Sequence, residues 1–314
     1  MNIILGSGLI GLLAKAIFPS WKIIPFYRSR FFSYNPALDD NYIVKDTRLD
    51  SFVKDLMGTA PAAYPYLKAY SVGGHLIREY HKDLCEDWLY KIFGVNYPNH
   101  AEKYFSTRMT QFVYNIRLNQ LYQSLTNKYI NEIKEEAAKG VVESVGNHYF
   151  VRNGKRVDFD NAISTIPLDA LQNLMGVNNK LESKPVHYLH IRTRDLDFEG
   201  ANQVFVVDKS FGFHKVTNIA PERYMVHCHE DIPQPGAYFM AFMKNFDIID
   251  GTSINGVIPI GNLPNMDNTT DNGIFCVGSY AEWDWCADVG TCVLRLLGHS
   301  QRQLKSKPVF NPNG

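Results

Sequence analysis

Short apolar runs and periodic apolar positions divide the chain into predicted strands and helices. Residues 2–5 form an apolar run typical of a buried strand, residues 12–18 favour a helix, and residues 21–27 form a second apolar run. The chain therefore begins with a strand, a helix and a strand, which is the unit from which parallel sheets are built.

The rest of the chain is helical at first and then rich in strand-like runs. Apolar residues recur at helical spacing over 73–94 and again over about 112–133. Residues 141–151, followed by a turn at Asn153-Gly154, predict a hairpin, and 161–167 predict a buried strand. Further strands are expected at 185–191, 202–207, 212–216, 224–229 and 274–277, with a more helical stretch at 238–246 and a final helix at 288–297.

A glycine-rich turn joins the first strand to the first helix. Gly6-Ser7-Gly8-Leu9-Ile10-Gly11 has the GxGxxG spacing in the strand–turn–helix context where that motif indicates dinucleotide binding. Gly6 permits the turn, Gly8 lets the backbone approach a pyrophosphate, and Gly11 lets helix and strand pack closely. The N–H groups and the positive dipole end of the helix would bind the phosphates.

The acidic residue that such motifs place after the second strand is missing. Tyr27 or Arg28 stands at that position, and Arg30 follows closely. An arginine there could hold a 2′-phosphate or fold back onto the pyrophosphate, and a solvated pair of arginines is an equal alternative. The sequence leaves open whether Arg28 or Arg30 contacts a cofactor.

Composition and charge exclude several classes of protein. The 314 residues are 45% hydrophobic, enough for one elaborate domain or two intertwined ones. The 32 basic residues balance 32 acidic ones, so no net charge steers the chain to nucleic acids or membranes. No apolar stretch reaches the roughly 18 residues that span a bilayer. Five scattered cysteines and no signal sequence favour a cytoplasmic protein without disulfides or a zinc site.

Three separated segments together resemble the superfamily of FAD-dependent amine oxidases and UDP-galactopyranose mutases. They are the glycine turn, the strand at 160–168 with Thr165 and Pro167, and residues 276–285 with Gly278 and Ser279. The resemblance implies that these segments bind FAD. In this family the final helix points its N-terminus at the flavin pyrimidine carbonyl, a role that would fall to the backbone around Asp288 and Val289.

The resemblance and the order of elements predict an α/β fold. We expect a Rossmann-type FAD-binding domain, an inserted helical segment, and a substrate domain with a mixed or antiparallel sheet. The FAD-binding domain would be discontinuous, at 1–60, 130–175 and 270–300. The helical cap segment would cover 61–129, and the β-rich substrate domain 176–269.

The segment before the final helix is most similar to the mutase branch but departs from it. Ser279 stands where that branch has an arginine, and Trp285 stands where it has the tyrosine that joins this arginine on the substrate diphosphate. The cationic clamp for a sugar nucleotide is therefore absent, and a faithful UDP-sugar mutase is not expected. Residues 90–94 are similar to another mutase element, and Arg108 to an arginine that holds substrate phosphate.

Residues 213–216 are similar to the mutase segment beside the flavin ring, which implies that Lys215 lies near flavin N5. A cation there could stabilise anionic reduced flavin, hold a water, or promote reaction with oxygen. A solvated strand lysine is the alternative. His214 would point to the opposite face of the strand, so at most one of the two would face the flavin.

Two other groups of side chains suggest chemistry less directly. Trp283 and Trp285 could form an aromatic wall for a flat substrate, or they could be ordinary packing residues. His227 and His229 share a face of a strand, but no third ligand at metal-binding spacing is visible, so no metal is expected.

The sequence thus predicts an FAD-dependent oxidoreductase that acts through flavin N5 on a small amine-like or nucleotide-linked substrate. Two alternatives stay open. One is a redox-neutral transferase or isomerase of the mutase type with an altered substrate, and the other is a non-catalytic FAD-binding protein. The chain has no overall charge that indicates nucleic-acid binding, although a local basic patch stays possible, and no membrane is expected as a partner.

Overall fold

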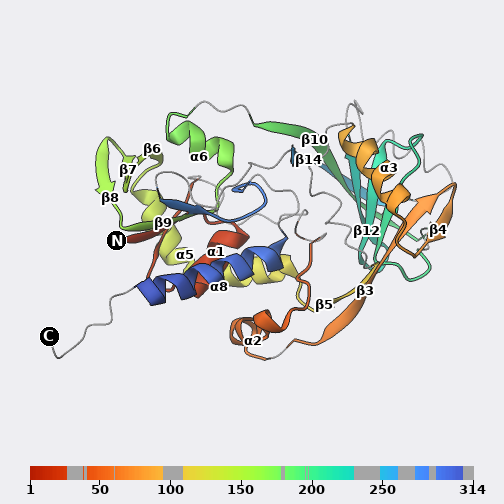
Figure 1. Ribbon diagram of the computed structural model, residues 1–314, viewed down its shortest axis with the longest axis horizontal. Coiled ribbons are helices and arrows are strands. Elements are labelled where there is room, and N and C mark those ends of the chain that lie inside the picture. The colour runs from red at the N-terminus through yellow and green to blue at the C-terminus, as the bar shows by residue number, and fades with distance from the viewer. Residues whose placement is uncertain are drawn as a thin grey trace.

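Two sheets lie in separate halves of the molecule, as the computed structural model shows in Figure 1. The structure describes residues 1–26, 38, 41–59, 61–94, 109–177, 181–194, 196, 198–229, 248–260, 273–282 and 288–306. The first half holds the N-terminal sheet with α1, α5 and α8, and the second half holds the larger sheet with α3.

The sheet of the first half is parallel and four-stranded. Its strands run in the order β15, β9, β1, β2, with bounds Ile274–Cys276, Asn161–Ser164, Asn2–Leu5 and Lys22–Ile24. Helix α1, Leu9–Ile17, connects β1 to β2, so the predicted strand–helix–strand unit is confirmed. These strands are buried on both faces and therefore read as nearly continuous apolar runs.

A different layer covers each face of this sheet. On one face, α1, α5 (Leu118–Ala138) and α8 (Val289–Ser306) pack against Ile4, Ile163 and Phe275. The opposite face is covered by α6 and by the antiparallel sheet of β6, β7 and β8, whose bounds are Leu168–Leu174, Val142–Gly146, Tyr149–Arg152 and Lys155–Asp158. The predicted hairpin is thus confirmed and carries a third strand. The short η2 (Thr47–Leu49) and α2 (Asp50–Met57) add Leu49 and Val53 to the core under the helices.

The larger sheet has eight strands in a mixed arrangement. Its order is β14, β10, β13, β12, β11, β3, β4, with β5 paired to β3. In that order the bounds are Ile248–Ile260, Glu182–Thr193, Arg223–His229, Phe213–Ala220, Gln203–Val206, Ala63–Val72 and His75–Ile77, with Thr110–Tyr114 for β5. The β11–β3 pair is parallel, and the other pairs are antiparallel. The fold therefore has the mixed α/β class that the sequence predicts.

Several predicted elements differ from the structure. The segment 61–129, expected to be helical, contributes β3, β4 and β5 as well as α3 (Lys82–Phe93) and the start of α5. Gly73 and Gly74 have φ values of 56° and 82° and form the turn between β3 and β4, so Leu76 and Ile77 belong to a strand. Strand β14 was not predicted because polar residues, two glycines and a proline interrupt its apolar positions. The helical stretch expected at 238–246 lies outside the described residues, and the domain boundaries stay a prediction.

Helix α3 is fixed to the larger sheet by polar contacts as well as by its apolar face. Lys91 Nζ donates to the carbonyl oxygens of Val206, Asp208 and Phe213 at 2.9, 2.6 and 2.8 Å. Trp88 Nε1 donates to the His214 carbonyl oxygen at 2.5 Å. One lysine therefore satisfies three carbonyls around the connection from β11 to β12.

Replacing Lys91 with methionine is expected to lower the free energy of unfolding by about 2 kcal/mol, because three carbonyls lose a charged donor while the apolar stem is kept. Denaturant unfolding monitored by circular dichroism measures this change. The matched control is Lys82→Met on the same helix, whose exposed ion pair with Glu86 should contribute less than about 1 kcal/mol. Equal effects of the two substitutions would contradict the role given to Lys91.

Candidate functional site

The glycine turn after β1 is shaped by two very close backbone approaches. Gly6 has a φ of 107°, and a Cβ added there would lie 2.5 Å from Thr165 Oγ1. A Cβ added at Gly11 would lie 2.1 Å from the carbonyl oxygen of Gly6. Both distances are far below van der Waals contact, so only glycine fits at these positions. The roles predicted for Gly6 and Gly11 in turn formation and close packing therefore have a structural basis.

Gly8 lies in the opposite situation, because a Cβ added there would meet no atom of the described residues within 4 Å. Gly8 is the N-cap of α1, no side chain caps this helix, and its first turn contains no acidic residue. Open space thus lies beside a helix N-terminus whose N–H groups point outward. The turn fits a pyrophosphate. Leu9 and Ile10 pack their side chains in the core, so only their backbone could contact a cofactor.

The two other segments of the motif meet the glycine turn at the carboxyl ends of the parallel strands. Leu5, Ser164 and Cys276 lie in register at the ends of β1, β9 and β15. Thr165 Oγ1 donates to the Leu5 carbonyl oxygen at 3.1 Å, and Pro167 follows as the N-cap of α6. A Cβ added at Gly278 would lie 3.9 Å from Ile10 Cγ1, and Ser279 follows in the turn. The structure therefore brings the three segments together at the edge where open α/β sheets bind ligands.

The N-terminus of α8 carries a half-buried carboxylate. Asp288 Oδ1 accepts a hydrogen bond from the Thr291 N–H at 2.7 Å, and Val289 begins the helix. Burial raises the pKa of Asp288, although the backbone donors of this helix and the charge of Lys68 act in the opposite direction. Asp288 thus partly offsets the positive end of the helix dipole at the place where the resemblance implies a flavin ring.

Two buried lysines lie on the larger sheet close to this helix end. Lys68 of β3 and Lys215 of β12 are 6% and 7% exposed. Burial and the nearby charge of Lys215 lower the pKa of Lys68 to about 8, while Asp288 acts to raise it. Lys68 therefore lies near enough to both Lys215 and Asp288 to feel their charges. Sequence reasoning missed Lys68, although a lysine inside the apolar run of β3 was the available signal.

His214 does not point to the opposite face from Lys215, so that prediction is wrong. A β-bulge between Phe213 and Lys215 breaks the alternation, and Phe213 and Val216 both pack in the cluster on the other face of the sheet. The His214 ring lies edge-on to Trp88 with a centroid distance of 5.6 Å. His214 is thus a core residue beneath α3.

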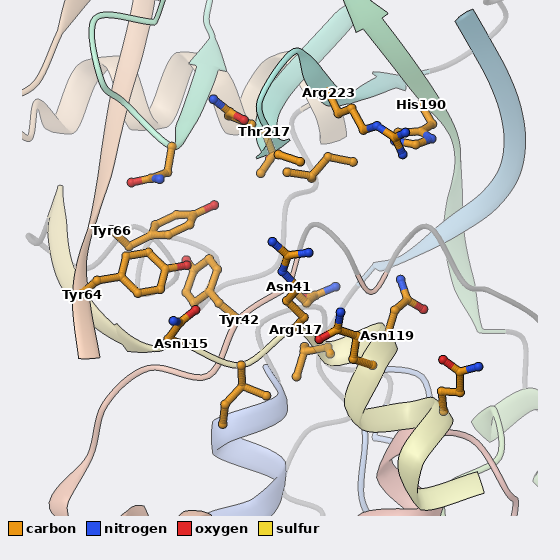
Figure 2. Close-up of a pocket in the computed structure, with 18 residues that line it drawn as sticks. Asn41, Tyr42, Tyr64, Tyr66, Asn115, Arg117, Asn119, His190, Thr217 and Arg223 are labelled. Carbon is orange, nitrogen blue, oxygen red and sulfur yellow. The ribbon is translucent and has the colours of Figure 1, made fainter. Parts of the chain in front are cut away.

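A cavity of about 470 Å³ opens next to the lysines, between the larger sheet and the start of α5 (Figure 2). Tyr66 and Thr217 line it, and each lies two residues along its strand from Lys68 or Lys215. Lys68 Nζ also lies 5.7 Å from the ring centroid of Tyr42, another lining residue. The volume is in the usual range of small-molecule sites.

Five predicted site residues, Arg28, Arg30, Arg108, Trp283 and Trp285, lie outside the described residues. Among the residues that are described, no group of three His, Cys, Asp or Glu side chains is placed to hold a metal. No helix in the described part of the chain is both long and apolar enough to cross a bilayer.

No protein-family model matches this sequence, and no curated protein matches it by sequence. Solved structures are similar in fold. Reduced UDP-galactopyranose mutase has a TM-score of 0.62 at 12% identity, covering 97% of this chain and 93% of that one. Wild-type putrescine oxidase bound to putrescine has a TM-score of 0.60 at 12% identity, covering 97% and 98%.

A third similar structure belongs to p-nitrophenol 4-monooxygenase from Pseudomonas putida, with a TM-score of 0.54 at 11% identity, covering 96% of this chain and 80% of that one. At such low identity these similarities show the fold alone. The chain shares a mixed α/β fold with the mutase, the oxidase and the monooxygenase over nearly its whole length.

Proposed function

We propose that this protein binds FAD and acts as an oxidoreductase through flavin N5 on a small amine-like or nucleotide-linked substrate. The observation that carries the proposal is the contrast within the glycine turn. Gly6 and Gly11 are needed for packing, whereas Gly8 faces open space at the uncapped N-terminus of α1. A turn that binds no ligand has no need of glycine at the position of Gly8.

Different residues of the chain would bind the different parts of FAD. The turn at 6–11 and Gly278 would bind the pyrophosphate, and the backbone at Asp288 and Val289 would meet the ring end. Bound FAD would supply hydride acceptance at N5, the step for which the side chains found here have no group. Lys68 and Lys215 supply positive charge beside Asp288, and the cavity next to them would hold the substrate.

The visible spectrum of the purified protein tests this proposal first. We expect a yellow protein, or a colourless one that takes up added FAD in a one-to-one ratio. Under anaerobic conditions a true substrate should bleach the flavin without any added reductant. A preparation that cannot be loaded with FAD would overturn the proposal.

A redox-neutral transferase of the mutase type is the second candidate. It is supported by Arg117 and Arg223, two guanidinium groups that line the cavity and suit a phosphate-bearing substrate. Such an enzyme should be inactive with oxidised flavin and become active after reduction with dithionite, without net electron transfer to the substrate. The same protein preparation therefore distinguishes the two candidates.

Replacing Lys215 with methionine is expected to leave FAD bound but to slow substrate-dependent flavin reduction by about tenfold or more, because a cation that favours the reduced flavin is lost. Anaerobic stopped-flow absorbance measures the rate, and dye equilibration should show a more negative midpoint potential. Lys54→Met on the exposed side of α2 is the control. An unchanged rate and an unchanged potential would make Lys215 a structural residue only.

A further inference from the structure

The cavity beside Lys68 and Lys215 is lined by cations and amides. Its charged lining residues are Arg117, which precedes α5, and Arg223, which begins β13. Both side chains are exposed, and neither forms an ion pair with a described residue, since neighbouring Glu222 pairs with Arg192 and Arg194 instead. Among the described residues, no aspartate or glutamate lines the cavity. Its electrostatic potential therefore favours an anion.

The floor of the cavity presents hydrogen-bond donors. Asn202 Oδ1 accepts from the Leu67 N–H at 2.8 Å, which turns the amide NH₂ of Asn202 away from that contact. Thr217 Oγ1, 2% exposed as a residue, accepts from Gln203 Nε2 at 3.1 Å and so has its own proton to donate. Both contacts fix the acceptor atom against the protein, so the donor of each side chain is the group available to a ligand.

The start of α5 adds to the positive electrostatic potential of the cavity. Residues 116–120 line the cavity, and they form the entry and first turn of this helix of 21 residues. No side chain caps the helix, and no acidic residue lies in its first turn. A helix dipole of this length places partial positive charge at that end.

Tyrosine rings give the cavity an aromatic wall. Tyr42 and Tyr66 lie with centroids 4.2 Å apart and planes tilted by 38°, and Tyr64 lines the same side, as Figure 2 shows. A flat or hydroxylated body can pack on these rings while an acidic group meets the guanidinium groups and the helix end.

The geometry points to an organic anion, a carboxylate or a phosphate ester on a flat or hydroxylated body, as the ligand of this cavity. A simple amine cation is disfavoured, because no described lining residue offers it a carboxylate and two guanidinium groups repel it. The inference rests on the proposed function only in treating the cavity as the substrate site. It narrows the amine-like or nucleotide-linked class to members that carry an acid group.

Binding of three matched probes tests the inference without any turnover. Phenyl phosphate, benzoate and benzylamine share one ring and differ in charge, and equilibrium dialysis against the purified protein measures each dissociation constant. We expect at least one anion to bind at least tenfold more tightly than benzylamine. Whichever of the two anions binds more tightly shows whether the cavity prefers a phosphate or a carboxylate group. Benzylamine binding as tightly as both anions would overturn the inference.

Variants place that binding in the cavity. Arg117→Gln and Arg223→Gln should each weaken binding of the preferred anion by about tenfold. Arg156→Gln on the exposed strand β8 should leave this affinity unchanged. Asn202→Asp keeps the acceptor for Leu67 and replaces a donor with negative charge, so it should abolish anion binding and favour benzylamine. Anion binding unaffected by all three cavity variants would contradict the site.

The two proposals fail in different ways. A protein that never binds FAD but shows the expected probe preferences would overturn the proposed function and leave the anion site intact. A flavin-loaded protein that binds benzylamine best, with normal unfolding of each variant, would overturn only the anion site.

Discussion

Adding one methyl group at Gly11 is expected to prevent stable folding of the first half of the molecule, whereas the same methyl group at Gly8 should leave the fold intact and weaken FAD binding. At Gly11 the new Cβ would lie 2.1 Å from the Gly6 carbonyl oxygen and 2.9 Å from its carbon. Neither atom can retreat, because the Gly6 N–H donates to the Ile24 carbonyl oxygen at 2.9 Å and α1 packs tightly on the sheet.

Gly8→Ala should change the free energy of unfolding of the FAD-free protein by less than about 0.5 kcal/mol, since its φ of −69° suits alanine and no atom in the described part of the chain lies within 4 Å of the new Cβ. The methyl group would instead occupy the place of the pyrophosphate and weaken FAD binding at least about tenfold. Thermal unfolding by circular dichroism and visible absorbance after dialysis against FAD measure the two effects. Unchanged FAD affinity in Gly8→Ala would contradict the predicted phosphate position.

The first half of the fold was predictable because its signals are local. The strands β1, β2 and β9 are short, buried on both faces and bounded by turns, and the glycine spacing identifies the connection between the first two. The larger sheet was less predictable. In β3 and β14 polar residues interrupt the apolar alternation. These two segments form strands because they pair with β11 and β10, respectively, which lie more than 50 residues away in the sequence.

The candidate site divides in the same way. The three segments predicted to meet do so, because each follows a strand of one parallel sheet. Lys68 and the cavity were missed because their partners come from distant elements, with Tyr66 on β3, Arg117 before α5, and Thr217 and Arg223 on β12 and β13. No short sequence pattern records that proximity. The bulge at His214 likewise depends on pairing with β13.

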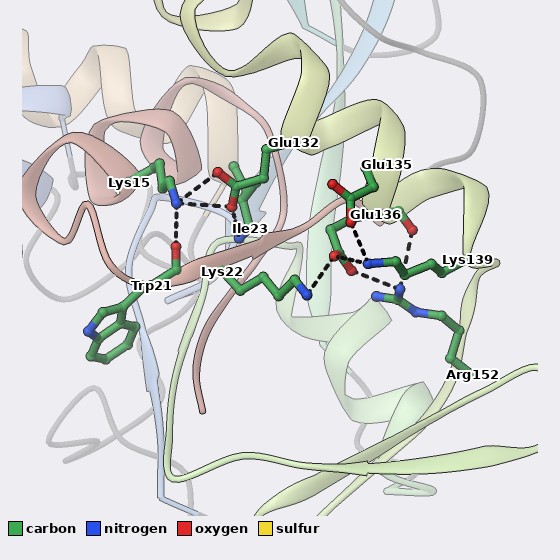
Figure 3. A network of polar contacts seen from close by, with 9 residues as sticks. All are labelled: Lys15, Trp21, Lys22, Ile23, Glu132, Glu135, Glu136, Lys139 and Arg152. Carbon is green, nitrogen blue, oxygen red and sulfur yellow. Dashed lines mark hydrogen bonds and ion pairs between the residues drawn. The ribbon is translucent and has the colours of Figure 1, made fainter.

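A buried polar network should contribute as much to stability as a large core side chain. Glu136 of α5, 3% exposed at its side chain, accepts from Lys22 of β2 at 2.8 Å, Lys139 at 2.6 Å and Arg152 of β7 at 3.0 Å (Figure 3). The carboxylate thus joins the parallel sheet, the long helix and the three-stranded sheet. Arg152 is itself 6% exposed, so it depends on Glu136 for its compensating charge.

Glu136→Ala is therefore expected to lower the free energy of unfolding by about 3–5 kcal/mol, because it leaves the buried guanidinium without a counter-charge. Glu135→Ala is the matched control, since its 70% exposed side chain pairs with Lys139 at the surface and should contribute less than about 1 kcal/mol. Adding Arg152→Met to Glu136→Ala should restore part of the loss, because it removes the unpaired charge. Denaturant unfolding of the wild-type protein, Glu136→Ala, Arg152→Met and the double variant completes a double-mutant cycle, and simple additivity would contradict the coupling.

The pH dependence of stability gives an independent measurement of the same network. Burial acts to raise the pKa of Glu136, but hydrogen bonds from Lys139, Lys22 and Arg152 outweigh it and hold the pKa below its ordinary value of 4.5. The unfolded chain therefore binds more protons than the native protein between the lowered pKa and 4.5, so the free energy of unfolding rises with pH across that interval. The contribution is complete above pH 4.5 and is lost as the pH falls through the lowered value. Glu136→Ala should show a flatter acid limb than the wild-type protein, and Glu135→Ala should keep the wild-type slope.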